Sequence, residues 1–296
     1  MLATKAVVSL GLGERLRAYA ELMKLRLSLL VAFSAAFGYL LAVPGPIDAL
    51  TLTVLCVSGF LLSGASTTLN QLWERDVDRL MKRTRDRPLP TGKISPQEAV
   101  GVAAVAAGVA LALLAQFTNT LTTLLALLSL VLYSFVYTPL KRVSPIAVLV
   151  GAFPGALPPL LGWVAATGAI SQEAMVIFGI QFIWQFPHFW AIAWVADEDY
   201  KRAGFKLLPS GGGKDMRTAV QIMTYTLFLI PLGLLPLKLG ITGVDSAIVV
   251  TICGVLFLGQ AFRLMIDGSR RAALYIMFSS FIYLPIVQVA FLLDKV

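Results

Sequence analysis

Apolar runs long enough to cross a lipid bilayer recur along the whole 296-residue chain. A bilayer core requires about 20 predominantly apolar residues per helix. The chain is 58% apolar and only 14% charged, whereas soluble domains are about half apolar and about a quarter charged. We therefore predict an all-α, polytopic membrane protein, in which residues 1–296 form a single bundle of nine transmembrane helices. The expected spans are Leu27–Val43, Ala49–Leu69, Ala99–Phe117, Leu121–Tyr137, Ile146–Thr167, Ala174–Val195, Thr218–Leu237, Ala247–Ile266 and Ala272–Leu293.

Basic residues gather in alternate gaps between these expected spans. If the amino terminus is cytoplasmic, all 24 lysines and arginines except Lys238 and Lys295 fall on the cytoplasmic side. This is the asymmetry that the positive-inside rule describes, and a missing or additional span would destroy it. We therefore predict a multi-pass protein of the cell inner membrane with its carboxyl terminus outside. The net charge of +8 then reflects topology and anionic lipid headgroups rather than nucleic-acid binding.

Two of the cytoplasmic loops are long and charged, and they span residues 70–96 and 196–217. We expect the site in these loops, because long loops on one face of a helical scaffold usually carry function. Residues 1–26 are expected to form an interfacial segment that leads into the first span. Cys56 and Cys253 lie in apolar runs and are expected to be packing residues without a disulfide framework.

Three polar residues at the end of the second span are spaced four apart. Asn70, Glu74 and Asp78 form one stripe if the helix continues, since each step of four residues turns the direction by only about 40°. Asp76 then points elsewhere. Two carboxylates and an amide oxygen suit a hard cation such as Mg²⁺, which takes the rest of its ligands from water and phosphate.

Arg83 and Arg87 follow this stripe directly, and guanidinium groups match phosphate oxygens. Acidic and basic groups in this order favour a metal–diphosphate site. The alternative is a solvated helix end with ordinary salt bridges between residues four apart. We favour the site, because Asn70 and Glu74 lie at the edge of a span, where unpaired polar groups are costly.

Three further polar groups leave functional and structural interpretations open. Lys141 ends the fourth span on the same face, and it either reaches a phosphate or only anchors the topology. Gln185 and His188 lie inside the sixth span among aromatic residues, where a lone histidine is either hydrogen-bonded in the core or part of a site. Asp199, in the second long loop, either completes a second metal position or belongs to a solvated loop.

Together these motifs resemble the UbiA-type intramembrane prenyltransferases, and most closely the branch of that family that farnesylates heme. An N-x-x-x-E-x-x-x-D-x-x-x-x-R-T-x-x-R-P-L pattern begins at Asn70, and a Y-x-x-x-K element begins at Tyr137. The W-Q-x-P-H-F signature of the heme-directed branch begins at Trp184, and D-Y-x-x-A-G begins at Asp199. The second acidic motif of the wider family is not intact here, because Ala196 occupies one of its acidic positions.

The resemblance implies transfer of the farnesyl group of farnesyl diphosphate to the vinyl group of heme b, which gives heme O, with Mg²⁺ as cofactor. It implies a lipid bilayer as surroundings and heme A synthase or a terminal oxidase as downstream partners. The implied metal ligands are Asn70, Glu74, Asp78 and Asp199. The implied catalytic residues are Asn70, Glu74, Asp78, Arg83, Arg87, Lys141 and His188. The implied substrate-binding residues are Arg83, Arg87, Tyr137, Lys141, Trp184, Gln185, His188, Asp199 and Tyr200.

Three alternatives compete with this interpretation. A related prenyltransferase could act on an aromatic quinone precursor such as 4-hydroxybenzoate, although the W-Q-x-P-H-F run argues against it. A transporter or cation channel would have polar residues spread through the midplane of several spans, whereas here they crowd one end. A heme-handling protein without catalysis would have no use for the acidic stripe. The role of His188 also stays open between a contact with the heme iron, a contact with a propionate and proton transfer.

Overall fold

The computed structural model describes residues 11–209 and 213–296. The first ten residues of the expected amino-terminal segment, including Lys5, lie outside this range. Within it, nine helical stretches are long and apolar enough to span a membrane. Their bounds are α2 (Leu25–Ala42), α3 (Ala49–Asp78), α5 (Pro96–Phe117), a composite span Thr120–Leu140, α8 (Ala147–Thr167), α9 (Gln172–Val195), a composite span Met216–Lys238, α13 (Val244–Asp267) and α14 (Arg270–Leu293).

This architecture confirms the expected helical bundle and its nine spans. Their bounds agree with the expected bounds within three residues, except that α3 continues to Asp78 instead of ending at Leu69. Which end of the bundle faces the cytoplasm stays a prediction. The remaining helices are short or are parts of the two composite spans: α1 (Leu12–Leu22), α4 (Pro88–Thr91), α6 (Thr120–Val131), the π-helix η1 (Leu132–Tyr137), α7 (Thr138–Leu140), α10 (Asp197–Arg202), α11 (Met216–Gly233) and α12 (Leu235–Lys238).

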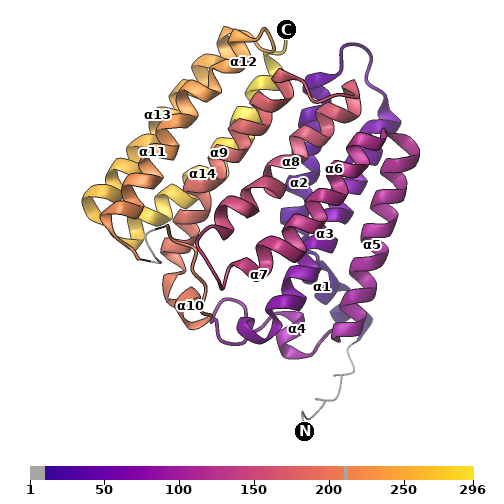
Figure 1. Ribbon diagram of the computed structural model, residues 1–296, viewed down its shortest axis with the longest axis vertical. Helices are drawn as coiled ribbons and strands as arrows, with labels where there is room; N and C mark the ends of the chain where they lie inside the picture. The colour runs from indigo at the N-terminus through magenta and orange to yellow at the C-terminus, as the bar shows by residue number, and fades with distance from the viewer. Residues whose placement is uncertain (1–10, 210–212) are drawn as a thin grey trace.

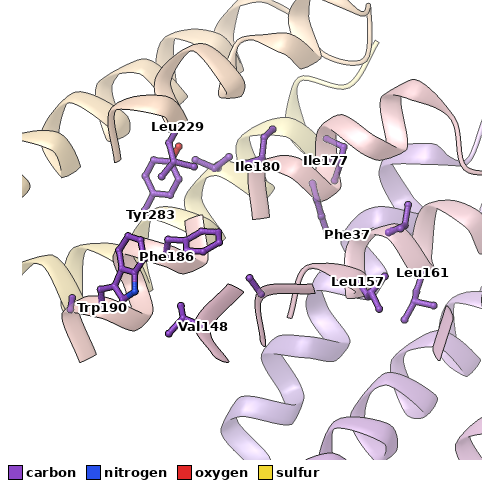
Figure 2. Close-up of a cluster of buried hydrophobic side chains, with 14 of the residues drawn as sticks. Phe37, Val148, Leu157, Leu161, Ile177, Ile180, Phe186, Trp190, Leu229 and Tyr283 are labelled. Carbon is purple, nitrogen blue, oxygen red and sulfur yellow. The ribbon is translucent and has the colours of Figure 1, made fainter. Parts of the chain in front are cut away.

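The helices surround α8, which is the most enclosed of the spans in the described chain. Helix α8 packs on α2, α6 and α9, while α14 packs on α9, α13 and α2 and so brings the last span against the first. Helices α1, α4, α7 and α10 gather at one end of the bundle, and α12 and the carboxyl terminus lie at the other (Figure 1). A continuous apolar core fills the space between the helices, and Ile177, Ile180, Phe186 and Trp190 of α9 belong to it (Figure 2).

Backbone packs directly against backbone where α2 crosses α8. A Cβ atom added to Gly38 would lie 1.9 Å from the carbonyl oxygen of Pro159, and one added to Gly162 would lie 1.9 Å from that of Ala35. Only glycine is tolerated at such contacts, which are a common way for helices to associate in a membrane. The two glycines therefore set the separation of α2 and α8.

Prolines in α8 leave helix carbonyls without their usual partners, and side chains of neighbouring helices bond to two of them. A proline at position i removes the hydrogen bond to the carbonyl at i−4, so Pro158 and Pro159 free the carbonyls of Pro154 and Gly155. The hydroxyl of Ser129 donates to the first of these at 3.4 Å, and the amide of Gln181 donates to the second at 2.8 Å. In a membrane, where water cannot serve, such partners are required.

Candidate active site

Helix α3 carries a buried polar stripe at its carboxyl-terminal end. Asn70, Glu74 and Asp78 are 2%, 6% and 0% exposed, whereas the side chain of Asp76 is 68% exposed and pairs with Arg75 at the surface. The helix keeps its α-helical spacing to Asp78, so the three side chains lie on one face. The geometry expected from the four-residue spacing is therefore present.

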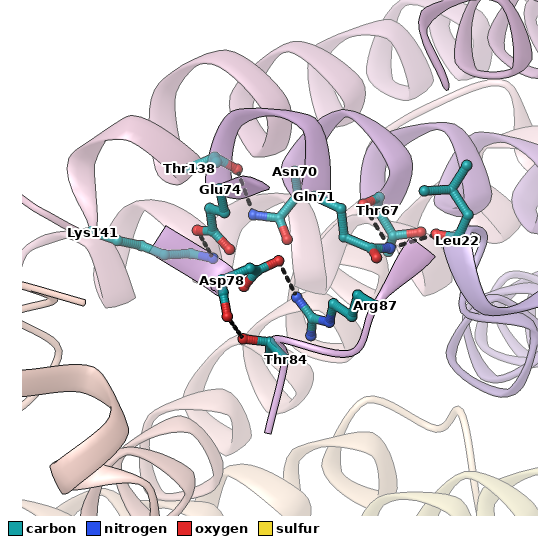
Figure 3. Close-up of polar contacts among 10 residues, drawn as sticks. All are labelled: Leu22, Thr67, Asn70, Gln71, Glu74, Asp78, Thr84, Arg87, Thr138 and Lys141. Atoms are coloured by element: carbon teal, nitrogen blue, oxygen red, sulfur yellow. Dashed lines mark hydrogen bonds and ion pairs between the residues drawn. The ribbon is translucent and has the colours of Figure 1, made fainter. Parts of the chain in front are cut away.

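Each carboxylate of the stripe is paired with one basic side chain (Figure 3). Lys141 Nζ lies 2.7 Å from Glu74 Oε1, and Arg87 Nη1 lies 2.9 Å from Asp78 Oδ2. Both pairs are largely removed from solvent, and removing one partner of a buried pair leaves an uncompensated charge that is strongly destabilising. The two pairs thus hold acids and bases together at one end of the bundle.

The stripe keeps oxygen atoms that no hydrogen bond uses. Asp78 Oδ1 is buried without a partner. Asn70 donates its amide to Thr138 Oγ1 at 3.1 Å, and among the described residues neither Asn70 Oδ1 nor Glu74 Oε2 has a hydrogen-bond partner. Buried polar atoms normally have partners. Among these three oxygens of the stripe, Asp78 Oδ1 is the one that is fully buried without a partner. Carboxylate and amide oxygens on one helix face are the kind of donor set that a hard cation such as Mg²⁺ prefers.

The acids do not form a complete metal cage by themselves. In residues 11–209 and 213–296, no three histidine, cysteine, aspartate or glutamate side chains come together as a metal site. A cation at the stripe would need the amide oxygen of Asn70 beside Glu74 and Asp78, and it would leave further positions to a ligand's oxygens. Mg²⁺ commonly binds in this way, through one or two carboxylates plus phosphate.

The two long loops meet at this end of the bundle. The carboxylate of Asp199 accepts the backbone N–H groups of Lys82 and Arg83 at 3.1 and 3.4 Å, and it also pairs with Arg202. Two backbone hydrogen bonds and one ion pair therefore occupy the carboxylate of Asp199, and the backbone bonds hold the loop that returns Arg87 to Asp78. The expectation that Asp199 binds a metal stays a prediction.

The structure separates the basic residues that the sequence could not distinguish. Arg87 reaches the stripe, whereas the side chain of Arg83 is exposed. Lys141 is buried on Glu74, whereas Arg142 is exposed. Burial alone would lower the pKa of Lys141, but the carboxylate of Glu74 outweighs burial and raises this pKa. Lys141 therefore keeps its positive charge at the site.

A second lysine at the site, Lys24, was not among the expected site residues. It lies in the break between α1 and α2 with φ of 47°, and it is the only non-glycine residue with positive φ in the described chain. Two side chains hold this break, since Gln71 donates to the carbonyl of Leu22 at 2.6 Å and Ser28 donates to that of Met23 at 2.9 Å. Strained backbone that its surroundings hold in place is typical of functional sites.

The surroundings of Lys24 are strongly charged. Burial, followed by the positive charges of Arg87 and Lys141, lowers the pKa of Lys24 to about 7, while Glu74 opposes this effect and Arg83 adds to it. Lys24 is thus within electrostatic reach of both ion pairs. Its ammonium group is disfavoured in the free protein and would be favoured by an added anion.

We expect anion binding at the site to depend on pH through Lys24. A bound diphosphate raises the pKa of Lys24 above its free value of about 7, so binding above neutral pH requires proton uptake. Affinity for pyrophosphate should therefore fall by up to about tenfold per pH unit between about pH 7 and pH 9. Inhibition by pyrophosphate, measured across this range, tests the expectation.

The Lys24→Met variant should bind pyrophosphate more weakly near neutral pH and lose this part of the pH dependence. Lys82→Met, which removes an exposed lysine of the loop after α3, is the matched control and should follow the wild type. Identical pH profiles for the wild type and Lys24→Met would contradict the prediction.

The three site residues expected on α9, namely Trp184, Gln185 and His188, contact neighbouring helices. Gln185 donates to the carbonyl of Ala152 on α8 at 2.8 Å, in the space that Gly155 leaves open. Trp184 stacks on His188 with ring centroids 4.5 Å apart. Gln185 thus has a structural contact, and its expected role in substrate binding stays a prediction.

Of the two expected tyrosines, Tyr137 contacts Lys141 directly and Tyr200 lies behind Phe205. The ammonium of Lys141 lies 4.6 Å from the ring centroid of Tyr137, and Gly151 provides the space for that ring. Tyr200 packs against Phe205, whose ring also faces Lys141. These aromatic rings form an apolar wall beside the charged stripe.

Thr138 and Lys24 were missed by reasoning from the sequence alone. Lys24 is one of several basic residues before the first span, and only the unusual backbone at the α1–α2 break distinguishes it. Thr138 accepts from Asn70 and donates to the carbonyl of Tyr133 at 2.8 Å. Its position directly before Pro139 gave no sign of this role. The sequence feature that could have indicated Thr138 is the Y-x-x-x-K element, which begins at the neighbouring Tyr137.

Comparison with known proteins gives the family that the sequence motifs resemble. The family model of the UbiA prenyltransferase family matches residues 31–283. A protoheme IX farnesyltransferase of Cytophaga hutchinsonii is 51% identical over 285 residues, which cover 96% of this chain and 100% of the relative. A protoheme IX farnesyltransferase of Christiangramia forsetii is 43% identical over 282 residues, which cover 94% of this chain and 93% of the relative.

Solved structures share the fold. A digeranylgeranylglyceryl phosphate synthase superposes with a TM-score of 0.78 at 22% identity, covering 95% of this chain and 98% of its own. A UbiA homologue from Archaeoglobus fulgidus, solved with DMAPP and Mg²⁺, gives a TM-score of 0.68 at 18% identity, covering 92% and 98%.

Fold and relatives together define a multi-pass membrane transferase. The chain belongs to the UbiA prenyltransferase family.

Proposed function

We propose that this protein transfers the farnesyl group of farnesyl diphosphate to a vinyl group of heme b and so makes heme O. The observation that carries the proposal is the buried stripe of α3, in which Glu74 and Asp78 are paired with Lys141 and Arg87 and still keep free oxygens. The choice of heme as acceptor is supported by the W-Q-x-P-H-F run and by the names of relatives up to 51% identical.

Basic side chains around the stripe would hold the diphosphate. Arg87 offers a planar guanidinium fork and Lys141 a compact ammonium, which suit phosphate oxygens in different geometries. Lys24 is placed to add a third positive charge. Since the allylic C–O bond breaks by releasing negative charge onto the diphosphate, fixed positive charges there stabilise the transition state.

Asn70, Glu74 and Asp78 would hold Mg²⁺ through the oxygens that lack partners in this structure. A bound Mg²⁺ supplies Lewis-acid neutralisation of the diphosphate. The contribution of the chain is to keep these oxygens on one rigid helix face. Thr138 assists because its hydroxyl accepts the side-chain N–H of Asn70. This hydrogen bond fixes the amide so that Oδ1 of Asn70 stays available for the cation.

The apolar bundle would protect the farnesyl cation from water. The terminal vinyl carbon of heme bonds to C1 of the farnesyl group as pyrophosphate departs, and the cation left on the adjacent carbon takes the oxygen of one water molecule, which loses a proton. Aromatic faces stabilise positive charge, and the rings of Tyr137 and Phe205 line the site beside Lys141. Excluding other water prevents hydrolysis of the cation.

The proposed location is the cell inner membrane, with the active-site end of the bundle toward the cytoplasm. The support is the distribution of basic residues, which gather at this end. Heme O made there would pass to a heme A synthase or a terminal oxidase. These partners, like the topology, are part of the proposal.

The decisive experiment is a heme analysis of cells that lack heme O and express this protein. Chromatography and mass spectrometry of extracted hemes should show heme O, and purified protein should form it from heme b, farnesyl diphosphate and Mg²⁺. If 4-hydroxybenzoate is prenylated instead, the acceptor is an aromatic quinone precursor. If neither acceptor yields a product, the proposal fails.

A further inference from the structure

Ser280 on α14 places its hydroxyl against the only histidine of the chain. Oγ of Ser280 lies 2.8 Å from Nδ1 of His188 on α9. The serine is 0% exposed and the histidine 8%. This hydrogen bond therefore joins two spans inside the bundle, and nothing in the sequence around Ser280 indicated it.

The direction of that hydrogen bond follows from a second contact of the serine. Ser280 Oγ lies 2.6 Å from the carbonyl oxygen of Met277 and donates to it. Two oxygens approach this closely only with a proton between them, and a carbonyl has no proton. The single hydroxyl proton of Ser280 is thus committed to Met277. Ser280 must accept from His188, so Nδ1 of the histidine carries the ring proton.

The ring of His188 is also fixed in orientation. Trp184 stacks on it at an interplanar angle of 18°, and the indole N–H of Trp184 donates to the carbonyl of Ser280 at 3.0 Å. Phe281 meets the ring edge-on with a centroid distance of 4.9 Å. A neutral imidazole protonated at Nδ1 keeps a lone pair at Nε2, and Nε2 has no hydrogen-bond partner in the described part of the chain.

A lone pair at Nε2 determines which part of heme this histidine can bind, the iron or a propionate. A propionate is an acceptor and needs an N–H group, whereas iron needs a lone pair. Histidines that bind metals usually donate their other ring N–H to an oxygen, which fixes the tautomer. We propose that Ser280 is a positioning residue, which holds His188 in the Nδ1–H tautomer so that Nε2 binds the iron of the heme substrate. This inference rests on the function proposed above.

The tautomer can be measured without heme. Because the chain has a single histidine, protein labelled with ¹⁵N-histidine gives the two ring nitrogens of His188 alone. The expected NMR spectrum shows a protonated, pyrrole-type Nδ1 and an unprotonated, pyridine-type Nε2. The Ser280→Ala variant should lose this preference, and Ser280→Thr, which keeps the hydroxyl, should restore it. A wild-type spectrum with the proton on Nε2 would overturn the inference.

Heme binding supplies the second measurement, with hemin titrated into purified full-length protein. The wild type should show the Soret band of nitrogen-ligated heme, and His188→Gln should lose it. Ser280→Ala should weaken hemin binding by about tenfold or more. Thr226→Val is the matched control, because Thr226 is a buried hydroxyl that only donates to a carbonyl of its own helix, and it should bind as the wild type does.

The outcomes separate this inference from the proposed function. If heme O is formed but His188→Gln or Ser280→Ala binds hemin with the wild-type spectrum and affinity, the inference is overturned and the proposed function stands. If the wild type shows the expected tautomer and His188-dependent hemin ligation but forms no heme O, the role of Ser280 is supported and farnesyl transfer to heme is excluded.

Discussion

Membranes that carry the Asp78→Asn variant should form at least about 100-fold less heme O than wild-type membranes, at equal protein level. Asp78 is fully buried, accepts from Arg87 through one oxygen and keeps the other without a partner. Asparagine has nearly the same shape, but it removes the negative charge that a cation would need. The loss of one preorganised electrostatic group at a reacting centre typically costs about 10²–10³ in rate.

The matched control for this prediction is Asp76→Asn. Asp76 lies two residues away on the same helix, and its side chain is 68% exposed in surface pairs with Arg75 and Arg79. The same change of charge there should leave heme O formation within about twofold of the wild type, since surface pairs contribute little. Equal activity of Asp78→Asn and Asp76→Asn would refute the proposed role of the stripe.

The Gly162→Ala variant should be strongly destabilised, although it adds only one methyl group. The added Cβ would lie 1.9 Å from the carbonyl oxygen of Ala35 and 2.5 Å from the backbone nitrogen of Tyr39. Neither atom is a flexible side-chain end, so α2 and α8 must move apart. Overpacking of this kind costs about 1–3 kcal/mol, which corresponds to a fall of about 2–12 °C in the midpoint of thermal unfolding.

Detergent-solubilised protein, heated and analysed by fluorescence-detected gel filtration, provides the measurement. Gly108→Ala is the control, because a Cβ at Gly108 of α5 meets nothing within 4 Å. Alanine is favoured over glycine by about 1 kcal/mol inside a helix, so this control should be as stable as the wild type or slightly more stable. An unchanged midpoint for Gly162→Ala would show that α2 and α8 are not in close backbone contact.

The spans were predictable because apolar length and charge placement are properties of the sequence alone. The stripe of Asn70, Glu74 and Asp78 was predictable for a similar reason, since four-residue spacing places side chains on one helix face whatever surrounds the helix. The apolar part of the second span ends at Leu69, and the helix continues to Asp78, as the stripe requires.

Other parts of the site depend on contacts between distant segments. The sequence does not distinguish Arg87 from Arg83, because only the path of the loop, fixed by Asp199, returns one of them to Asp78. Likewise Lys141 and Arg142 are adjacent, and only the face that each occupies decides which is buried. The role of Lys24 depends on a backbone conformation that Gln71 and Ser28 hold in place.

The π-helix η1 holds one residue more than an α-helix would need to cover the same stretch. Its wide turn, Leu132–Tyr137, precedes Thr138 and Lys141, which both contact α3. A π-type turn accommodates an extra residue with little change in the direction of the helix that follows. In continuous α-helix, by contrast, one added residue turns everything after it by about 100° and shifts it by about 1.5 Å along the axis. Loss of one residue within η1, with a return to α-helical spacing, should therefore leave Lys141 beside Glu74, whereas one residue added to α-helical spacing between Tyr137 and Lys141 should separate them.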